Sequence, residues 1–117
     1  MKKLEKKALI FGITGQDGSY LANYLIKKNY KVFGISRKKN FKYTLNLQKL
    51  DILKNVKLTQ LIEVNRLKIE KVINKIRPSE IYYFAGQSSV NQSFKFPLET
   101  YLSNNITLFY ILDFLRK

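Results

Sequence analysis

The 117-residue sequence contains no cysteine and no histidine. These absences exclude a disulfide bond, a thiolate nucleophile, a Cys/His zinc site and an imidazole base, so we expect no metal site. No apolar run approaches the roughly 18 residues of a membrane span, and the first residues lack the apolar segment of a signal peptide. We therefore expect no membrane contact and a cytoplasmic location.

Acidic residues are also scarce, at 8 against 22 basic residues, which gives a formal net charge of +14 at pH 7. Such an excess raises nucleic acid as a partner, because Lys and Arg bind phosphates. The lysines are spread along the chain, however, and the heavy use of Lys, Asn and Ile fits a bias in composition. Specific nucleic-acid binding is not expected, whereas a diffuse positive field favours anionic ligands such as dinucleotides.

Hydrophobic residues make up 45% of the chain, which indicates a folded domain. Short apolar runs alternate with amphipathic stretches, a pattern typical of an α/β fold with a parallel sheet. We predict strands at residues 7–11, 31–36, 56–62 and 80–84. We predict helices from Gly18 or Ser19 to Lys28, over 65–77 and over 98–115, whereas the signals between 40 and 55 are mixed. Asn29 stands where a left-handed helix end is expected.

Three glycines at three-residue spacing follow the first predicted strand: Gly12, Gly15 and Gly18. Residues without a Cβ let a chain turn sharply, let a pyrophosphate approach its backbone, and let a new helix pack tightly on the sheet. The N–H groups of that helix would then point at the phosphates, and Asp17 or Ser19 could cap it. The predicted dinucleotide-binding residues are Gly12, Ile13, Thr14, Gly15, Gln16, Asp17 and Gly18. The alternative is a glycine-rich turn that serves packing alone.

The tip of the second predicted strand carries Arg37-Lys38-Lys39 and no acidic residue. In Rossmann folds a carboxylate at this tip accepts from the ribose 2′-OH of NAD, whereas Arg or Lys accommodates the 2′-phosphate of NADP. Arg37 and Lys38 are therefore predicted to favour NADP(H). The alternative is a solvated basic turn in a lysine-rich protein.

Two motifs carry a resemblance to a known family. The first is Gly12-Ile13-Thr14-Gly15-Gln16-Asp17-Gly18-Ser19-Tyr20-Leu21-Ala22. The second is Pro78-Ser79-Glu80-Ile81-Tyr82, which leads into Ala85-Gly86-Gln87-Ser88-Ser89-Val90 and Ser93-Phe94. Both resemble GDP-mannose 4,6-dehydratases, which are lyases of nucleotide-sugar metabolism in the NAD-dependent epimerase/dehydratase group of short-chain dehydrogenases. The resemblance spans nearly the whole chain but only the N-terminal part of such an enzyme.

The resemblance implies a partial Rossmann fold, with a parallel sheet of about four strands in the order 3-2-1-4 flanked by helices. The family has an Arg at the position of Arg37 and uses NADP. Its loop at Ala85, Gly86, Gln87 and Ser88 passes beside the cofactor. The sequence also departs from the family. Ile62 replaces the Asp that holds the adenine amino group, Tyr83 replaces an Asn, and Glu99 stands where a cofactor-contacting Tyr is usual.

The catalytic set of the superfamily is a Ser or Thr with a Tyr-x-x-x-Lys, whose Tyr acts as a general base. In the family this pair follows the position of Leu115. Only Tyr24 and Lys28 have the spacing here, in a helix where the family has no catalytic role. We expect residues 1–117 to form an incomplete NADP-binding Rossmann domain, without the C-terminal strands, the catalytic residues or the substrate domain, and inactive alone.

The expected partners are NADP(H), a nucleotide sugar if the missing part is supplied, and a second copy or a split-enzyme partner. A non-enzymatic dinucleotide-binding module and a degenerate remnant stay open as alternatives. The fourth strand is expected at a sheet edge, where exposed backbone invites pairing with another chain. The turns of the last helix carry an apolar stripe of Leu102, Ile106, Phe109 and Leu112 or Asp113. We predict that this stripe packs on the core; a dimer face is the alternative.

Overall fold

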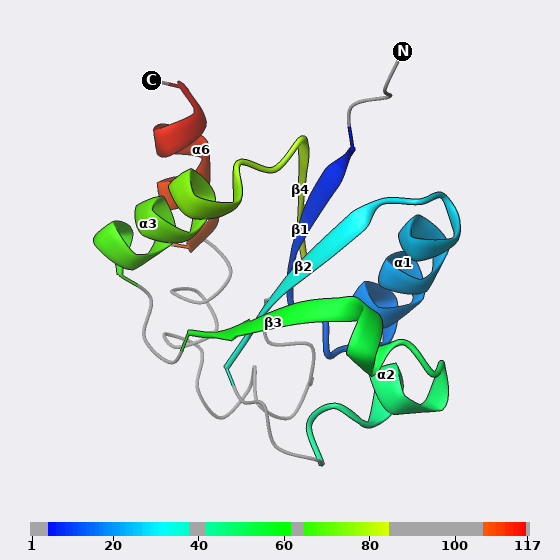
Figure 1. The fold of residues 1–117 in the computed structure, drawn as a ribbon. Helices are drawn as coiled ribbons and strands as arrows, with labels where there is room; N and C mark the ends of the chain where they lie inside the picture. Colours follow the sequence, from blue (N-terminus) through cyan, green and yellow to red (C-terminus); the bar gives the residue numbers. More distant parts are fainter. Residues whose placement is uncertain (1–4, 38–41, 62–64, 85–106, 117) are drawn as a thin grey trace.

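The computed structural model describes residues 5–37, 42–61, 65–84 and 107–116. Figure 1 shows the strands in the middle of the molecule with helices on both sides. The strands are β1 (Lys7–Phe11), β2 (Lys31–Ser36), β3 (Val56–Gln60) and β4 (Glu80–Tyr83). The helices are α1 (Gln16–Lys27), α2 (Leu45–Lys49), the 3-10 turn η1 (Leu53–Asn55), α3 (Arg66–Ile76) and α6 (Thr107–Arg116).

The strands form one parallel sheet in the order β3-β2-β1-β4, which confirms the predicted order. β1 lies inside the sheet, and its last residue, Phe11, is level with Ile35 of β2 and Tyr83 of β4. The carboxyl ends of these three strands therefore meet at one edge of the sheet. In Rossmann folds this edge holds the ligand.

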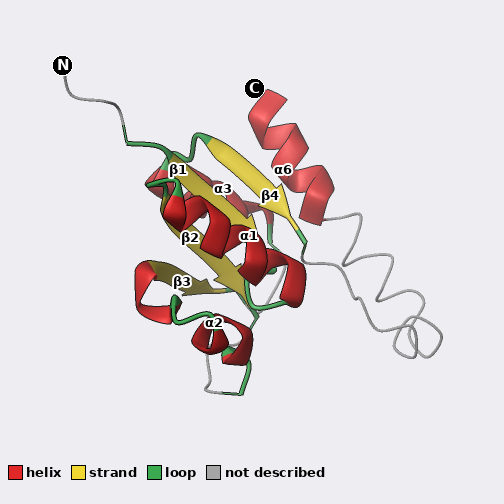
Figure 2. Cartoon of the chain, turned by 90° about the vertical axis from the view of Figure 1, so that its right-hand side faces the viewer, coloured by secondary structure: helices red, strands yellow, loops and turns green. Residues whose placement is uncertain are grey.

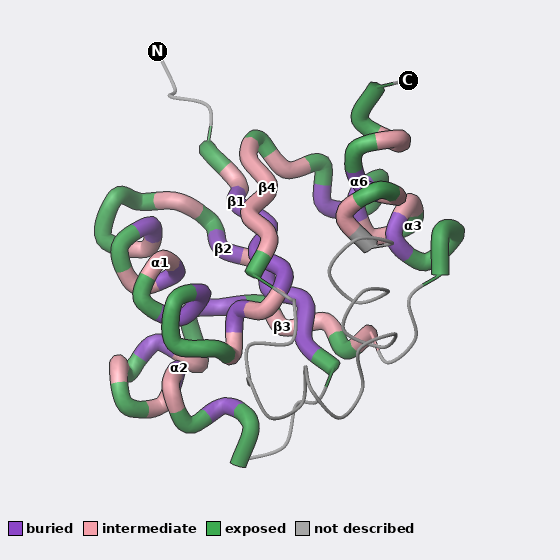
Figure 3. The backbone as a smooth tube through the Cα atoms, turned by 180° about the vertical axis from the view of Figure 1, so that it is seen from behind, coloured by how far each residue is buried: buried purple, intermediate pink, exposed green. Residues whose placement is uncertain are grey.

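The two faces of the sheet are covered by different helices, as Figures 1 and 2 show. Ala8 and Ile10 of β1 pack with α1 and α2, whereas Leu9 and Phe11 pack with α3 and α6. Successive residues of a strand point to opposite faces, so a wholly apolar β1 can serve both cores. Figure 3 shows the buried residues concentrated on β1 and β2, and β4 half-buried at its edge position.

Helix α1 begins at Gln16, two or three residues earlier than expected, and has a different cap. Gly15 is its N-cap, and neither Asp17 nor Ser19 caps the helix: no side-chain cap bond forms, and the Ser19 hydroxyl donates to the carbonyl of Gln16 at 2.9 Å. The predicted cap is therefore wrong. The helix start is set by backbone bonds, from Gly15 N–H to the Gly12 carbonyl and from Ser19 N–H to the Gly15 carbonyl. Past its other end, Asn29 has a φ of 68°, the left-handed conformation predicted from the sequence.

The remaining boundaries follow local signals. Asn65 caps α3, accepting from two N–H groups of the first turn, and Arg77 at a φ of 54° ends the helix before Pro78. The mixed segment forms α2 and η1, with Leu47 fully buried. β3 ends at Gln60, and the predicted end at Ile62 lies outside the described residues. Within the described part, no helix is both long and apolar enough to cross a membrane.

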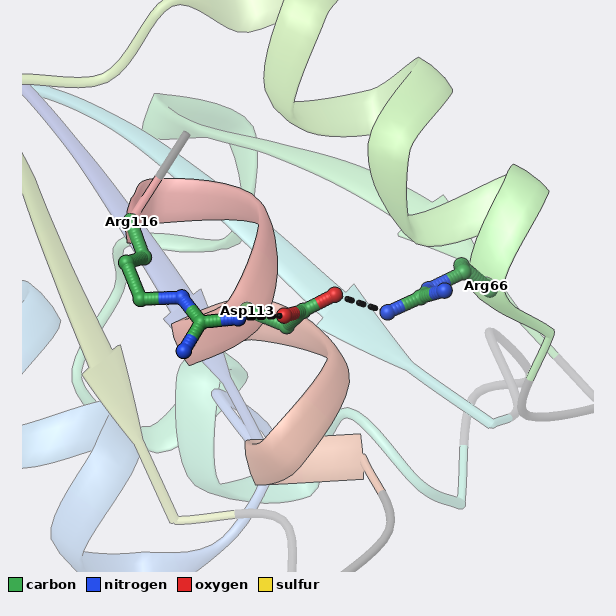
Figure 4. Close-up of polar contacts among 3 residues, drawn as sticks. All are labelled: Arg66, Asp113 and Arg116. Carbon is green, nitrogen blue, oxygen red and sulfur yellow. Dashed lines mark hydrogen bonds and ion pairs between the residues drawn. The ribbon is translucent and has the colours of Figure 1, made fainter.

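The predicted apolar stripe of the last helix is wrong at Phe109 and Leu112, whereas its other apolar members, Leu102 and Ile106, lie outside the described residues. In α6, Ile111 is buried, whereas Phe109 and Leu112 stay 59% and 58% exposed. The rotation of the helix agrees with a polar contact: Asp113 pairs with Arg66 of α3 and with Arg116 of its own helix (Figure 4). The Asp113 side chain is only 12% exposed in these pairs, whereas Phe109 and Leu112 face solvent. The expected start of this helix, residues 98–106, lies outside the described residues.

Candidate functional site

The glycine loop joins the carboxyl end of β1 to α1. Gly12 has a φ of 82°, a backbone conformation that residues with a side chain rarely adopt. Its N–H donates to the carbonyl of Ile35 at 3.1 Å. This bond attaches the start of the loop to β2. Gly15 then donates to the carbonyl of Gly12 at 3.1 Å, so the loop closes into a tight turn before the helix begins.

Gly18 and Gly15 differ sharply in what surrounds them. A methyl group at Gly18 would lie 2.4 Å from the Gly12 carbonyl oxygen and 2.9 Å from Cα of Ile13. Only glycine therefore lets α1 pack so closely on the loop. Gly15 is exposed, and a methyl group there would meet only the Gly12 carbonyl oxygen, at 3.4 Å. The side of the loop at Gly15 is thus open to a ligand.

The first turn of α1 faces this open side. In any α-helix the first N–H groups have no acceptor within the helix, and the helix dipole gives that end a partial positive charge. The first bond of this helix runs from Ser19 N–H to the Gly15 carbonyl, so the N–H groups of Gln16, Asp17 and Gly18 have no acceptor within the helix. Gln16 and Asp17 are exposed. This arrangement can bind an anion with backbone groups alone.

Three residues that the sequence did not single out, Gly34, Ser36 and Asn46, support the loop. Ile13 is fully buried, so no part of this predicted binding residue is exposed to a ligand, and its side chain occupies the space above Gly34. A methyl group at Gly34 would lie 2.4 Å from Cγ2 of Ile13. The hydroxyls of Thr14 and Ser36 lie 3.5 Å apart, and Asn46 Nδ2 donates to the Thr14 carbonyl at 2.9 Å. A glycine inside a predicted strand was a usable signal for Gly34; no sequence pattern points to Asn46.

The predicted 2′-phosphate position lies at the same edge of the sheet. Arg37 follows Ser36 directly at the end of β2, is exposed, and its carbonyl accepts from Gln60 Nε2 at 3.1 Å. Strand β4, on the other side of β1, also leads to this edge, because Phe84 N–H donates to the carbonyl of Phe11 at 2.8 Å. Lys38 and the predicted cofactor residues Ala85, Gly86, Gln87 and Ser88 lie outside the described residues, as do Ile62 and Glu99.

The Tyr-x-x-x-Lys match lies elsewhere. Tyr24 is 57% exposed, and Lys28 Nζ lies 5.6 Å from its ring centroid. Tyr24 is eight residues beyond Gln16, or about 12 Å along the helix. The pair is therefore at the far end of α1 from the glycine loop. In the described part of the chain, no cluster of three or more acidic residues could hold a metal ion.

The opposite, amino end of the sheet carries a polar cluster on Glu80. Tyr30 and Tyr82 donate to its two carboxylate oxygens at 3.1 and 3.0 Å. Burial, and then the hydrogen bond to Glu80, raise the pKa of Tyr82 above its ordinary value. The cluster joins the α1–β2 connection to β4, so its position makes it a structural feature of the edge strand rather than part of the loop site.

Comparison with known proteins agrees with this architecture. The family model described as GDP-mannose 4,6 dehydratase matches residues 9–117. GDP-mannose 4,6 dehydratase of Drosophila melanogaster is 38% identical over 121 residues, which cover 96% of this chain and 30% of that protein. The human protein of the same name is 41% identical over 100 residues, covering 80% of this chain and 27% of its own length.

A solved structure with a similar fold is UDP-glucose 4-epimerase of Thermus thermophilus in complex with NAD. It superposes with a TM-score of 0.77 at 19% identity, over 94% of this chain and 33% of the epimerase. At that identity the match shows the Rossmann-type fold. This chain thus spans about a third or less of the proteins it matches. By its sequence it belongs to the GDP-mannose 4,6-dehydratase family.

Proposed function

We propose that this chain provides the NADP(H)-binding part of a GDP-mannose 4,6-dehydratase-type enzyme. The observation that carries the proposal is the packing of Gly18 against Gly12, which brings the first turn of α1 to the open side of the loop at Gly15. A pyrophosphate placed there meets N–H groups that have no acceptor within the helix, and the positive end of the helix dipole. Backbone atoms supply this binding, so it does not depend on the part of the family enzyme that this chain does not cover.

The choice of NADP over NAD rests on the end of β2. Arg37 is exposed at the ligand edge of the sheet. It directly follows Ser36, whose hydroxyl lies 3.5 Å from that of Thr14. The described residues place no carboxylate at this tip to accept from a ribose 2′-OH. A guanidinium can instead donate two hydrogen bonds to a 2′-phosphate.

In the complete family enzyme the nicotinamide, when bound, would accept the hydride from C4 of the hexose and return it at C6 once water had been lost across C5 and C6. The described residues of this chain provide binding and orientation for that chemistry. The spacing of the catalytic Tyr and Lys occurs only at Tyr24 and Lys28, at the wrong end of α1. We therefore expect the chain to bind cofactor but not to convert GDP-mannose on its own.

The test is a titration of the 117-residue chain with NADPH and with NADH, in which binding is measured by calorimetry or by cofactor fluorescence. We expect saturable binding with NADPH preferred by about tenfold or more, the size of a charge-assisted contact to phosphate. Arg37→Ala should remove the preference and leave NADH binding unchanged. Lys31→Ala, at the other end of β2, removes the same charge and serves as the control. Equal affinities for both cofactors in the wild-type chain would contradict the NADP assignment.

A further inference from the structure

The peptide bond between Thr14 and Gly15 is held on both of its edges. Asn46 Nδ2 donates to its carbonyl oxygen at 2.9 Å, and its N–H donates to the Gly12 carbonyl at 3.1 Å. The C=O and N–H of a trans peptide point in opposite directions. The two hydrogen bonds therefore oppose any rotation of this peptide unit, which lies directly before the helix whose N–H groups face the ligand side.

Asn46 can act as a fixed donor because its own helix is well anchored. It lies 32 residues from Thr14 in the sequence, on α2, and its neighbour Leu47 is fully buried. Leu47 packs in the same core cluster as Ile13 and Ala22 of the loop and α1. The hydrogen bond is partly buried, so water replaces it poorly if it is lost.

We infer that Asn46 is a positioning residue for the phosphate-binding loop; the inference rests on the proposed cofactor site. Its amide holds the Thr14 carbonyl toward α2 and neutralises part of the charge on that oxygen. Without the donor, the carbonyl is free to turn toward the first turn of α1. There its partial negative charge would oppose a bound pyrophosphate. Helix α2, which follows β2 in the chain, thus also sets the geometry of the glycine loop after β1.

The experiment compares Asn46→Asp with Asn74→Asp in the full chain. Both variants lose the same side-chain amide and the same unit of net charge, and Asn74 is exposed on α3, away from the loop. NADPH affinity is measured by fluorescence titration, stability by urea unfolding, and hydrogen exchange at the Gly15 amide by NMR. We expect Asn46→Asp to weaken NADPH binding roughly five- to tenfold beyond the control, and to accelerate exchange at Gly15. An Asn46→Gln variant, which retains the amide, should recover part of the NADPH affinity and part of the protection of the Gly15 amide from exchange.

Equal effects of the two Asp variants on affinity would overturn the inference, because net charge alone would then explain them. Unchanged exchange at Gly15 in Asn46→Asp would also overturn it, since that amide belongs to the peptide that Asn46 holds. The exchange measurement needs no cofactor. If the wild-type chain fails to bind NADPH, the proposed function fails, while faster exchange at Gly15 still supports the positioning role.

Discussion

Replacing Gly18 with alanine tests the loop most directly. The added methyl group would lie 2.4 Å from the carbonyl oxygen of Gly12 and 2.9 Å from Cα of Ile13, and both are backbone atoms. Alanine normally stabilises a helix by up to about 1 kcal/mol relative to glycine. Overpacking costs about 1–3 kcal/mol, and more where the neighbours cannot shift. Because the Gly12 N–H is hydrogen-bonded to Ile35 of β2, the loop cannot move away freely. We therefore expect Gly18→Ala to lower the free energy of unfolding by about 1–2 kcal/mol.

The assay is urea unfolding followed by far-UV circular dichroism, with NADPH titration of the folded protein. Gly15→Ala is the matched control, because a methyl group there meets only one atom, at 3.4 Å. We expect Gly15→Ala to change the free energy of unfolding by less than about 1 kcal/mol, the scale of an N-cap substitution. It should weaken NADPH binding, because the methyl group occupies the open side of the loop. A Gly18→Ala protein as stable as the wild type would refute the packing argument.

Two further predictions concern other parts of the fold. Asp113→Asn should lower the free energy of unfolding by about 1 kcal/mol, because Arg66 and Arg116 both lose their partner, and the loss should shrink in high salt. The raised pKa of Tyr82 predicts that stability falls at alkaline pH. The tyrosine ionises near a pH of about 10 in the unfolded chain but is still neutral there in the folded chain. The free energy of unfolding therefore falls as pH rises from there through the folded pKa. Tyr82→Phe should flatten that fall in urea unfolding measured across the alkaline range, and an unchanged slope would contradict it.

Parts of the fold that depend on neighbouring residues in the chain were predictable. β1 and β2 match the predicted strands, because their apolar runs are bounded by turn residues. Asn65 and Pro78 bracket α3 as the helix signals indicate. The start of α1 was missed by two or three residues, since backbone bonds within the glycine loop, rather than a side-chain cap, decide where the helix begins.

The sequence by itself determined the α/β class, the glycine loop, the basic residue after β2 and the family, because each depends on residue types at fixed short spacings. Only the tertiary structure decided which face of α6 is buried, since a contact between Asp113 and Arg66, 47 residues apart, goes with its rotation. The same holds for the supports of the loop. Gly34 and Asn46 act through space on Ile13 and Thr14, and such contacts exist only once β2 and α2 lie beside the loop.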